Sequence, residues 1–172
     1  MIRVRQGATG HISVAGLACY RPGERCRLIC RLHQYRGRKG ETKAFTWTDY
    51  RDLLVAAHRQ LPGGNIVLVW DNLPVHLRAE LRAFAAAQGW LRVFQLPSYA
   101  PDLNPVEGIW SVIKGGVLAN LAAASFSHVL QVIRHGLKKI QYQPGLISGC
   151  LTGTGLSLDQ TSRHHELKIS SC

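Results

Sequence analysis

Two acidic residues, Asp71 and Glu107, lie at positions from which a fold could bring their carboxylates together. Asp71 follows the apolar run IVLVW at 66–70, which is typical of a strand buried on both faces. Glu107 follows Asn104 and Pro105, which predict the start of a helix. A strand–helix–strand–helix path can place the end of a central strand beside the first turn of a packed helix. Two carboxylates meeting there could hold Mg²⁺, which prefers oxygen ligands and retains water.

Such a pair would suit two-metal chemistry, but each acid also has a purely structural interpretation. With two ions roughly 3.5–4 Å apart, one would activate an attacking water or 3′-hydroxyl and the other would stabilise the leaving oxygen. Glu107 lies three residues after Asn104, so it could instead close a helix capping box. Asp71 followed by Asn72 could form a strand-to-loop turn. Residue types and spacing alone leave these interpretations open.

The surrounding pattern predicts an α/β layered domain. Residues 11–20 and 25–35 are predicted as an antiparallel hairpin joined by the turn RPGE at 21–24. Thr48 is the predicted cap of the first helix. Further strands are predicted at 66–70 and 91–96, and helices at 48–61, 76–88, from 104 through Val117, and at 127–141. At least two strands are then joined by a βαβ connection.

Composition favours an intracellular protein with a polyanionic partner. Lys and Arg number 21 against 10 Asp and Glu, which gives a formal net charge of +11 and a pI near 10.0. The five cysteines, an odd number, and an N-terminus without a signal-peptide core indicate a reducing compartment. No apolar stretch is long enough for a membrane helix. Cys26, Cys30 and His33 lack a second ligand pair with zinc spacing, so a zinc site is disfavoured.

Two longer motifs resemble those of a known family. The segment VWDNLPVH at 69–76 and the segment LPSYAPDLNPVEGIWSVIK at 96–114 resemble the second and third acid motifs of DDE-type transposases. The resemblance is to the mariner superfamily, in particular its bacterial insertion-sequence branch. It extends from about Val4 to Leu158 and includes TGTGL at 152–156. It implies a ribonuclease-H-like domain that cuts DNA at transposon ends and joins the freed 3′-hydroxyl to target DNA.

The resemblance also implies roles for individual residues. Asp71 matches the second catalytic acid and Glu107 the third, so both would bind Mg²⁺ or Mn²⁺, two ions in the complete family site. Asn72 and His76 match motif positions beside the site. His76 is interpreted as a positioning or phosphate-contacting residue, or else as a solvated histidine at a helix start.

Two further motif residues have less specific interpretations. Tyr99 could pack on sugar or base, or simply cover the edge of the core. Lys114, on roughly the same helix face as Glu107, could meet a DNA phosphate or remain an ordinary surface lysine.

The sequence departs from the family before the predicted hairpin. The family's first catalytic acid lies on a strand that precedes the region matched here by 11–20, and this sequence is expected to begin after that strand. Upstream of Asp71 none of the acids matches the missing position; they are Glu24, Glu41, Asp49 and Asp52. A helix-turn-helix region is also not found. We therefore expect an incomplete catalytic domain over residues 1–158, a poorly ordered tail over 159–172, and impaired cleavage.

Three functions remain in competition. The first is a transposase catalytic domain that acts on transposon ends and target DNA, expected as a homodimer in the bacterial cytoplasm close to the nucleoid. The second is a DNA-binding or dimerisation remnant without turnover. The third is a nuclease of RNA–DNA hybrids, which is disfavoured because it would also need the acid-bearing first strand. The first two share salt-sensitive DNA binding and differ in metal-dependent nicking.

Overall fold

The computed structural model describes residues 2–6, 10–61, 64–98, 100–119 and 125–158. In chain order its elements are β1 (Ile2–Gln6), β2 (Gly10–Cys19), β3 (Arg27–Tyr35), α1 (Trp47–Gln60), β4 (Ile66–Trp70), α2 (Ala79–Ala86), β5 (Leu91–Gln95), the 3₁₀ turn η1 (Pro101–Leu103), α3 (Pro105–Val112), the π-helical turn η2 (Ile113–Val117), α4 (Phe126–Gln141) and α5 (Pro144–Thr152).

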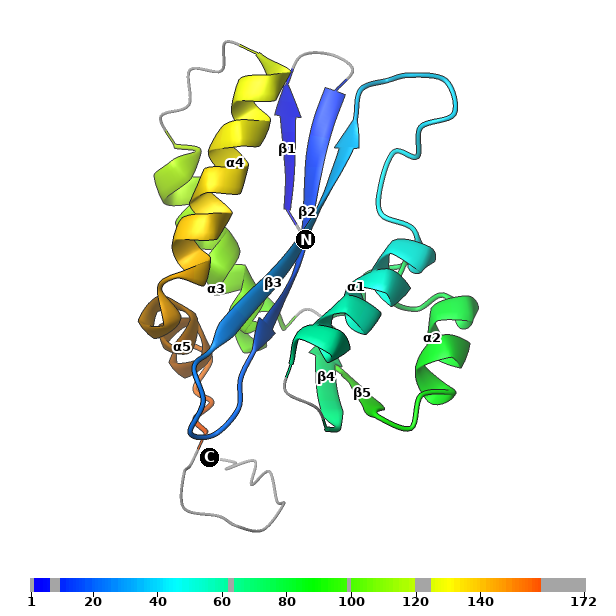
Figure 1. Ribbon diagram of the computed structural model, residues 1–172, viewed down its shortest axis with the longest axis vertical. Helices are drawn as coiled ribbons and strands as arrows, with labels where there is room; N and C mark the ends of the chain where they lie inside the picture. Colours follow the sequence, from blue (N-terminus) through cyan, green and yellow to red (C-terminus); the bar gives the residue numbers. More distant parts are fainter. Residues whose placement is uncertain (1, 7–9, 62–63, 99, 120–124, 159–172) are drawn as a thin grey trace.

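The strands form two sheets (Figure 1). β1, β2 and β3 form an antiparallel sheet in that order, while β4 and β5 form a parallel pair. The predicted hairpin is confirmed, with Ala15 opposite Arg31 in its register. Its turn closes through the Glu24 amide, which donates to the Arg21 carbonyl at 3.1 Å. Gly23 lies in the left-handed region at φ 75°, a conformation that glycine adopts without the usual steric cost.

A strand precedes the hairpin, contrary to expectation. β1 pairs antiparallel with the first half of β2, from Ile2 opposite Val14 to Gln6 opposite Gly10. The sequence IRVRQ alternates apolar and basic residues, which is the period of a strand. We expected the sequence to begin after the strand that precedes the hairpin, whereas pairing with β2 supplies the backbone partners with which residues 2–6 form such a strand. β1 carries no carboxylate, so it does not provide the family's first acid.

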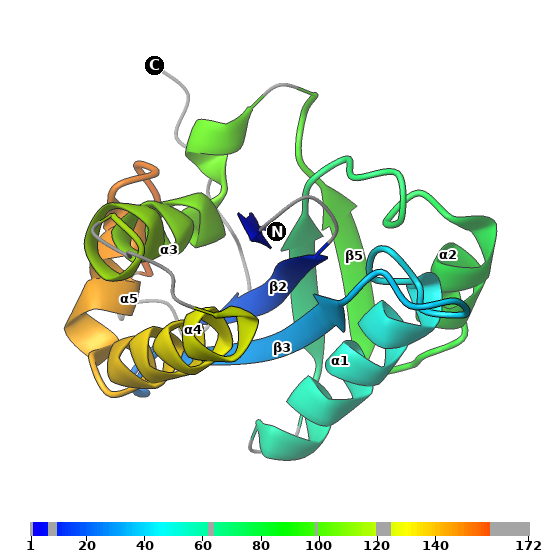
Figure 2. The same ribbon diagram turned by 90° about the horizontal axis from the view of Figure 1, so that it is seen from above.

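Helices cover both faces of the antiparallel sheet (Figures 1 and 2). α3, α4 and α5 lie on one side, where Ile12, Val14 and Leu28 pack with their apolar residues. α1 lies on the other side and packs against Ala15 and Ile29. The same cluster includes residues of β4, α2 and β5, so α1 joins the two sheets through one core. None of the helices in the described ranges is both long and apolar enough to cross a membrane.

The β4–β5 pair is buried on only one face, which corrects the prediction of a strand covered on both sides. Leu68 and Trp70 are each 7% exposed and face α1 and α2, whereas Val67 and Val69 are 52% and 54% exposed. An apolar run alone cannot show whether a second layer exists to cover it. Only the packing of the other elements decides that.

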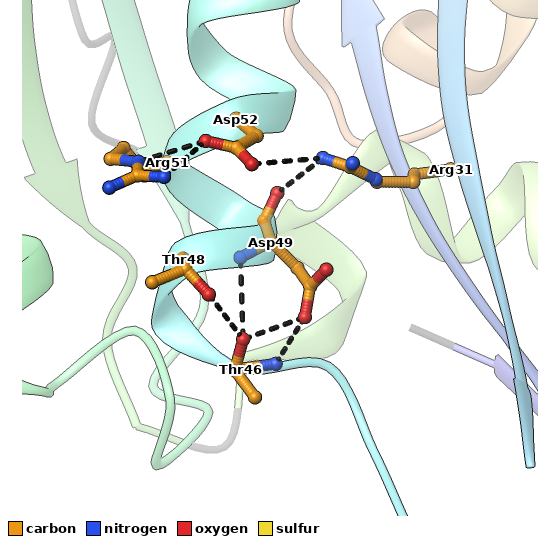
Figure 3. Close-up of polar contacts among 6 residues, drawn as sticks. All are labelled: Arg31, Thr46, Thr48, Asp49, Arg51 and Asp52. Atoms are coloured by element: carbon orange, nitrogen blue, oxygen red, sulfur yellow. Dashed lines mark hydrogen bonds and ion pairs between the residues drawn. The ribbon is translucent and has the colours of Figure 1, made fainter. Parts of the chain in front are cut away.

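A capping box starts α1, two residues earlier than predicted (Figure 3). Thr46, not Thr48, is the N-cap: its hydroxyl accepts from the Asp49 amide at 3.4 Å, and its own amide donates to Asp49 Oδ2 at 2.9 Å. Thr48 only shares a hydroxyl contact with Thr46 at 2.7 Å. Arg31 of β3 donates to the Asp49 carbonyl at 3.2 Å and so ties the first turn to the sheet.

Three other predicted boundaries change. α2 begins at Ala79 rather than at 76, because residues 74–77 form a separate turn in which the His76 amide donates to the Leu73 carbonyl at 2.8 Å. Leu77, predicted to face the core, is 42% exposed. The helix that starts at Pro105 changes to π-helical geometry at Ile113, and the Val117 side chain lies outside the described part.

α5 is a helix that the sequence did not predict. Its glycine-rich composition favours loop, but Ile147 packs in the core with residues of α3 and α4, and Leu151 is also buried, so packing outweighs weak propensity. The tail predicted over 159–172 lies outside the described residues.

The capping box predicts a specific stability pattern. Thr46→Ala and Asp49→Asn should each lower the free energy of unfolding at neutral pH by about 1 kcal/mol, since the first leaves the Asp49 amide without its acceptor and the second replaces the charged acceptor of the Thr46 amide by a neutral one. Thr48→Ala, the matched control, should cost clearly less. Urea unfolding followed by circular dichroism measures all three, and a larger loss for Thr48→Ala would contradict the assignment of Thr46 as the cap.

The effect of Asp49→Asn should depend on pH. Burial raises the pKa of Asp49, but the Thr46 amide, the Thr46 hydroxyl and Arg31 outweigh it, so the pKa lies below its ordinary value of 3.8. A lowered pKa stabilises the folded state above the unfolded-state value, and this contribution disappears as the pH falls through the folded-state value. The difference in stability between wild type and Asp49→Asn should therefore shrink in acid.

Candidate metal site between two strand ends and a helix

Asp71 and Glu107 line the same pocket. The pocket has a volume of about 180 Å³ and is formed by the loops after β4 and β5 together with the start of α3. Its lining residues are Asp71, Asn72, Leu96, Pro97, Ala100, Pro101, Asn104 and Glu107. Residues far apart in the sequence are thus brought together around one small cavity, at the place where the sequence predicted a site.

Parallel pairing brings the two loops to one edge of the β4–β5 sheet. Trp70 pairs with Gln95, and the Leu96 amide donates to the Trp70 carbonyl at 2.9 Å, so both strands end side by side. Asn72 then joins the two loops directly, because its Nδ2 donates to the Leu96 carbonyl at 2.8 Å. The carboxyl ends of parallel strands are the usual position of ligand sites in α/β sheets.

Asp71 is oriented by contacts on the side of its own loop. Its Oδ1 accepts from His76 Nδ1 at 2.8 Å and from the Leu73 amide at 3.2 Å. Because an ionised carboxylate only accepts hydrogen bonds, the proton of the imidazole lies on Nδ1 in this contact. The turn predicted for Asp71 and the candidate site are therefore both present, and one side chain takes part in both.

The same contacts favour the charged form of Asp71. Partial burial of the carboxylate raises its pKa, but the hydrogen bond from His76, the charge of His76 and the Leu73 amide lower it more. The pKa of Asp71 therefore lies below its ordinary value. An acid kept ionised at the rim of a pocket is suited to attract a cation.

His76 is part of the core rather than a solvated side chain. It is 7% exposed, and its ring stacks on Trp70 with centroids 4.8 Å apart and planes 6° from parallel. Tyr50 of α1 meets the same ring edge-on at 4.6 Å and 89°. The solvated interpretation is thus wrong. His76 contacts Asp71 from the buried side and is not among the residues that line the pocket.

The position of Glu107 follows from how α3 starts. Asn104 is its N-cap, with a side-chain oxygen that accepts from the Val106 amide at 3.2 Å, and Pro105 occupies the first turn. The Asn104 amide donates to the Pro101 carbonyl at 2.9 Å, which ties the cap to η1. Glu107 is half-buried in the first turn, with its amide donating to the Asn104 carbonyl at 3.0 Å.

α3 is held in place by a close contact with β2. Ile109, Trp110 and Ile113 are fully buried, and the Trp110 ring lies against Gly16 so closely that a Cβ at Gly16 would be 2.8 Å from Cη2 of the ring. On its other side Gly108 leaves room for Cys150 of α5. Sequence analysis did not identify Gly16 or Trp70 as contributors to the site; the position of Trp70 directly before Asp71 was the available signal.

The other acids that precede Asp71 have local partners away from the pocket. Glu24 pairs with Arg21, Glu41 accepts from the amides of Arg36 and Arg38, and Asp49 belongs to the α1 cap, while Asp52 pairs with Arg51 at 2.8 Å. Within the described ranges, no three His, Cys, Asp or Glu residues are grouped so that they could hold a metal ion. The pocket thus offers two carboxylates.

Two other predicted site residues do not line the pocket. Lys114 is exposed in the π-helical turn after α3 and is not among the residues that line the pocket. Tyr99 lies outside the described residues.

Comparison with known proteins identifies the family and supports the fold. A protein of the insertion element IS630 from Shigella sonnei is 28% identical over 80 residues, which are 46% of this chain and 23% of that protein. The Mos1 mariner transposase in its paired-end complex with Mn is similar with a TM-score of 0.52 at 18% identity, covering 92% of this chain and 48% of that chain. The Mos1 strand transfer complex gives 0.51 at 18% identity, covering 92% and 47%.

This chain therefore spans about half the length of the Mos1 chains and a quarter of the IS630 protein. The structural similarity shows a ribonuclease-H-like fold, as the sequence predicted. The family model described as DDE superfamily endonuclease matches residues 17–130, well over half of the chain. With Asp71 and Glu107 both inside the matched region, the chain belongs to the DDE superfamily endonucleases.

Proposed function

We propose that this chain forms the metal-binding catalytic domain of a mariner-type DNA transposase, in which Asp71 and Glu107 are the second and third catalytic acids. The observation that carries the proposal is the single pocket lined by both carboxylates. The family gives the reaction class, and the acids are the residues in the pocket with suitable chemistry. The substrates would be the DNA at the ends of an insertion element and a target DNA.

The donors in the pocket fit a hard divalent cation. Asp71 and Glu107 would hold Mg²⁺ or Mn²⁺ through carboxylate oxygens, the ligand type these ions prefer. Because its pKa is lowered, Asp71, one of the two acidic ligands, stays ionised over the physiological pH range. When bound, divalent ions in such a site supply activation of a water or 3′-hydroxyl and stabilisation of the leaving oxygen.

The protein's own contribution is to keep the ligands in position. His76 holds one oxygen of Asp71 through Nδ1, and the ring is itself fixed between Trp70 and Tyr50. Outer-shell contacts of this kind orient metal ligands and increase metal affinity. Asn72 keeps the two loops at a fixed separation by its bond to the Leu96 carbonyl. A pre-positioned site loses less conformational entropy when it binds substrate.

Two carboxylates are fewer than the three that the family resemblance implies for a complete site. With no third acid among the described lining residues, binding of a second ion would depend on phosphate oxygens or on a ligand from elsewhere. We therefore propose that cleavage and strand transfer by this chain alone are weak.

DNA is the proposed partner. The chain has a formal net charge of +11, which suits a phosphate backbone. The structures it resembles are a paired-end complex and a strand transfer complex of Mos1 transposase. By the same resemblance we propose that it acts as a homodimer on DNA.

A second candidate function is favoured by the pocket's two-acid composition. A DNA-binding remnant without turnover would keep the positive charge and the fold while lacking a complete metal site. The two candidates differ in whether divalent ions produce nicks in DNA, because counterion release on binding needs no metal.

Metal binding tests the role of the two acids. Asp71→Asn and Glu107→Gln should each weaken Mn²⁺ binding at least about tenfold, since each removes a charged oxygen ligand. Free Mn²⁺ measured by electron paramagnetic resonance gives the affinity. Asp102→Asn is the matched control, because Asp102 is an exposed acid in the neighbouring η1 turn that does not line the pocket.

Plasmid nicking completes this test. Weak Mn²⁺-dependent nicking that disappears in Asp71→Asn and Glu107→Gln but persists in Asp102→Asn would support the transposase function. Mn²⁺ binding that depends on both acids without any nicking would favour the remnant. Mn²⁺ binding that is equal in all four proteins would contradict the metal site.

The positioning role of His76 predicts a change in the ionisation of Asp71. In metal-free protein, His76→Phe should raise the pKa of Asp71, because the hydrogen bond from Nδ1 is lost while a ring remains between Trp70 and Tyr50. Carboxyl ¹³C NMR titration measures the shift. His58→Phe is the control, since His58 stacks on Trp90 and has no recorded contact with Asp71. An unchanged Asp71 pKa in His76→Phe would refute the role.

A further inference from the structure

The C-terminal half of α4 carries cations on its solvent-facing side. Its exposed residues include Arg134, Lys138 and Lys139, and the sequence contains no Asp or Glu between Glu107 and Asp159. None of the ion pairs recorded among the described residues involves a cation of α4. The helix therefore presents positive charge that no described carboxylate neutralises.

A groove runs between this helix and the edge strand β3. It has a volume of about 280 Å³ and is lined by Cys30 and Leu32 of β3 and by Arg134, Lys138, Gln141 and Tyr142 around the C-terminal half of α4. Leu137 contributes to its apolar floor. The groove shares no lining residue with the pocket of Asp71 and Glu107, so it is a separate site.

The polar residues of the groove form an ordered row. Arg134, Lys138 and Tyr142 follow one another at intervals of four residues, so their side chains lie one above another along the same helix face. Tyr142 is 68% exposed, which is unusual for a large aromatic ring beside an apolar floor. Two cations and an aromatic ring thus point to the same strip of surface.

The end of α4 that carries this row is fixed to the sheet. Gln141 Nε2 donates to the Leu28 carbonyl at 2.9 Å, on the open edge of β3. Leu137 and Ile140 are buried in the core beneath it. The row is therefore presented on a rigid support, which lowers the entropic cost of binding.

We infer that this groove binds a single strand of DNA, with Arg134 and Lys138 contacting consecutive phosphates and Tyr142 stacking on an unpaired base. A cationic groove combined with an exposed aromatic ring is how single-stranded nucleic acid is bound without sequence preference. A duplex offers phosphates but no open base face along its side, so Tyr142 would add nothing there. The inference deepens the proposed function and rests on it in taking DNA as the ligand.

Fluorescence anisotropy with a labelled oligothymidine and a labelled duplex, both in EDTA, tests the groove. The double variant Arg134→Glu/Lys138→Glu should weaken oligothymidine binding at least about tenfold and reduce the slope of log affinity against log salt by about 1.4, the value for two lost contacts to a single strand. The matched control is Arg59→Glu/Arg82→Glu, which makes the same change of charge at exposed positions of α1 and α2, on the far side of the sheet (Figure 2).

Tyr142 separates single-strand binding from general attraction to DNA. Tyr142→Ala should weaken oligothymidine binding at least about fivefold and leave duplex binding unchanged, whereas Tyr142→Phe should keep both, because stacking needs the ring and not the hydroxyl. Equal losses in the two charge variants, or an unaltered affinity in Tyr142→Ala, would overturn the inference and indicate an ordinary solvated face. Circular dichroism melting confirms that each variant is folded.

The same assay distinguishes failure of the inference from failure of the proposed function. Asp102→Asn changes an exposed acid that lines neither the groove nor the pocket, and this variant should bind oligothymidine as the wild type does in EDTA. Loss of binding in the groove variants alone would support the groove even if no nicking were detected. Intact binding in the groove variants would refute it even if Mn²⁺-dependent nicking were observed.

Discussion

The contact between Trp110 and Gly16 is the constraint on which the candidate site depends. A Cβ at Gly16 would lie 2.8 Å from Cη2 of the indole, so this close packing of α3 on β2 needs a residue without a side chain there. Burying an aromatic side chain of this size contributes on the order of 2–3 kcal/mol. Because Glu107 lies one turn before Trp110, the depth of this contact sets where the carboxylate enters the pocket.

The two acids are held by independent parts of the fold. Asp71 is fixed from behind by His76, which belongs to the core shared by α1, β4 and α2. Glu107 is fixed by the capped start of α3, which belongs to the core on the opposite side of the antiparallel sheet. The pocket therefore forms only when both cores have assembled, so the site depends on the fold of the whole domain and not on a local motif alone.

Charge is distributed unevenly over the molecule. The described acids that precede Asp71 are occupied by local partners in turns and at the α1 cap, whereas the half formed by α3, α4 and α5 carries only cations after Glu107. A proposed metal pocket and a cationic groove are thus built from different elements. Both would face the same kind of polyanionic ligand.

The sequence by itself determined the hairpin, the β4–helix–β5 order, the acid-bearing positions of Asp71 and Glu107, and the family motifs around them. These features are encoded locally, in the period of apolar residues and in turn and cap residues such as Pro22 and Asn104. The division into a domain over 1–158 and a tail stays a prediction.

Tertiary structure decided the rest, because its causes lie far apart in the chain. β1 forms because β2 offers an edge, and α5 forms because Ile147 and Leu151 find a core. His76 is buried because Trp70 and Tyr50 enclose it, and the outer face of β4 is open because no described element covers it. Whether a side chain is buried depends on which distant segments pack against it, and a local pattern of residues contains no information about those segments.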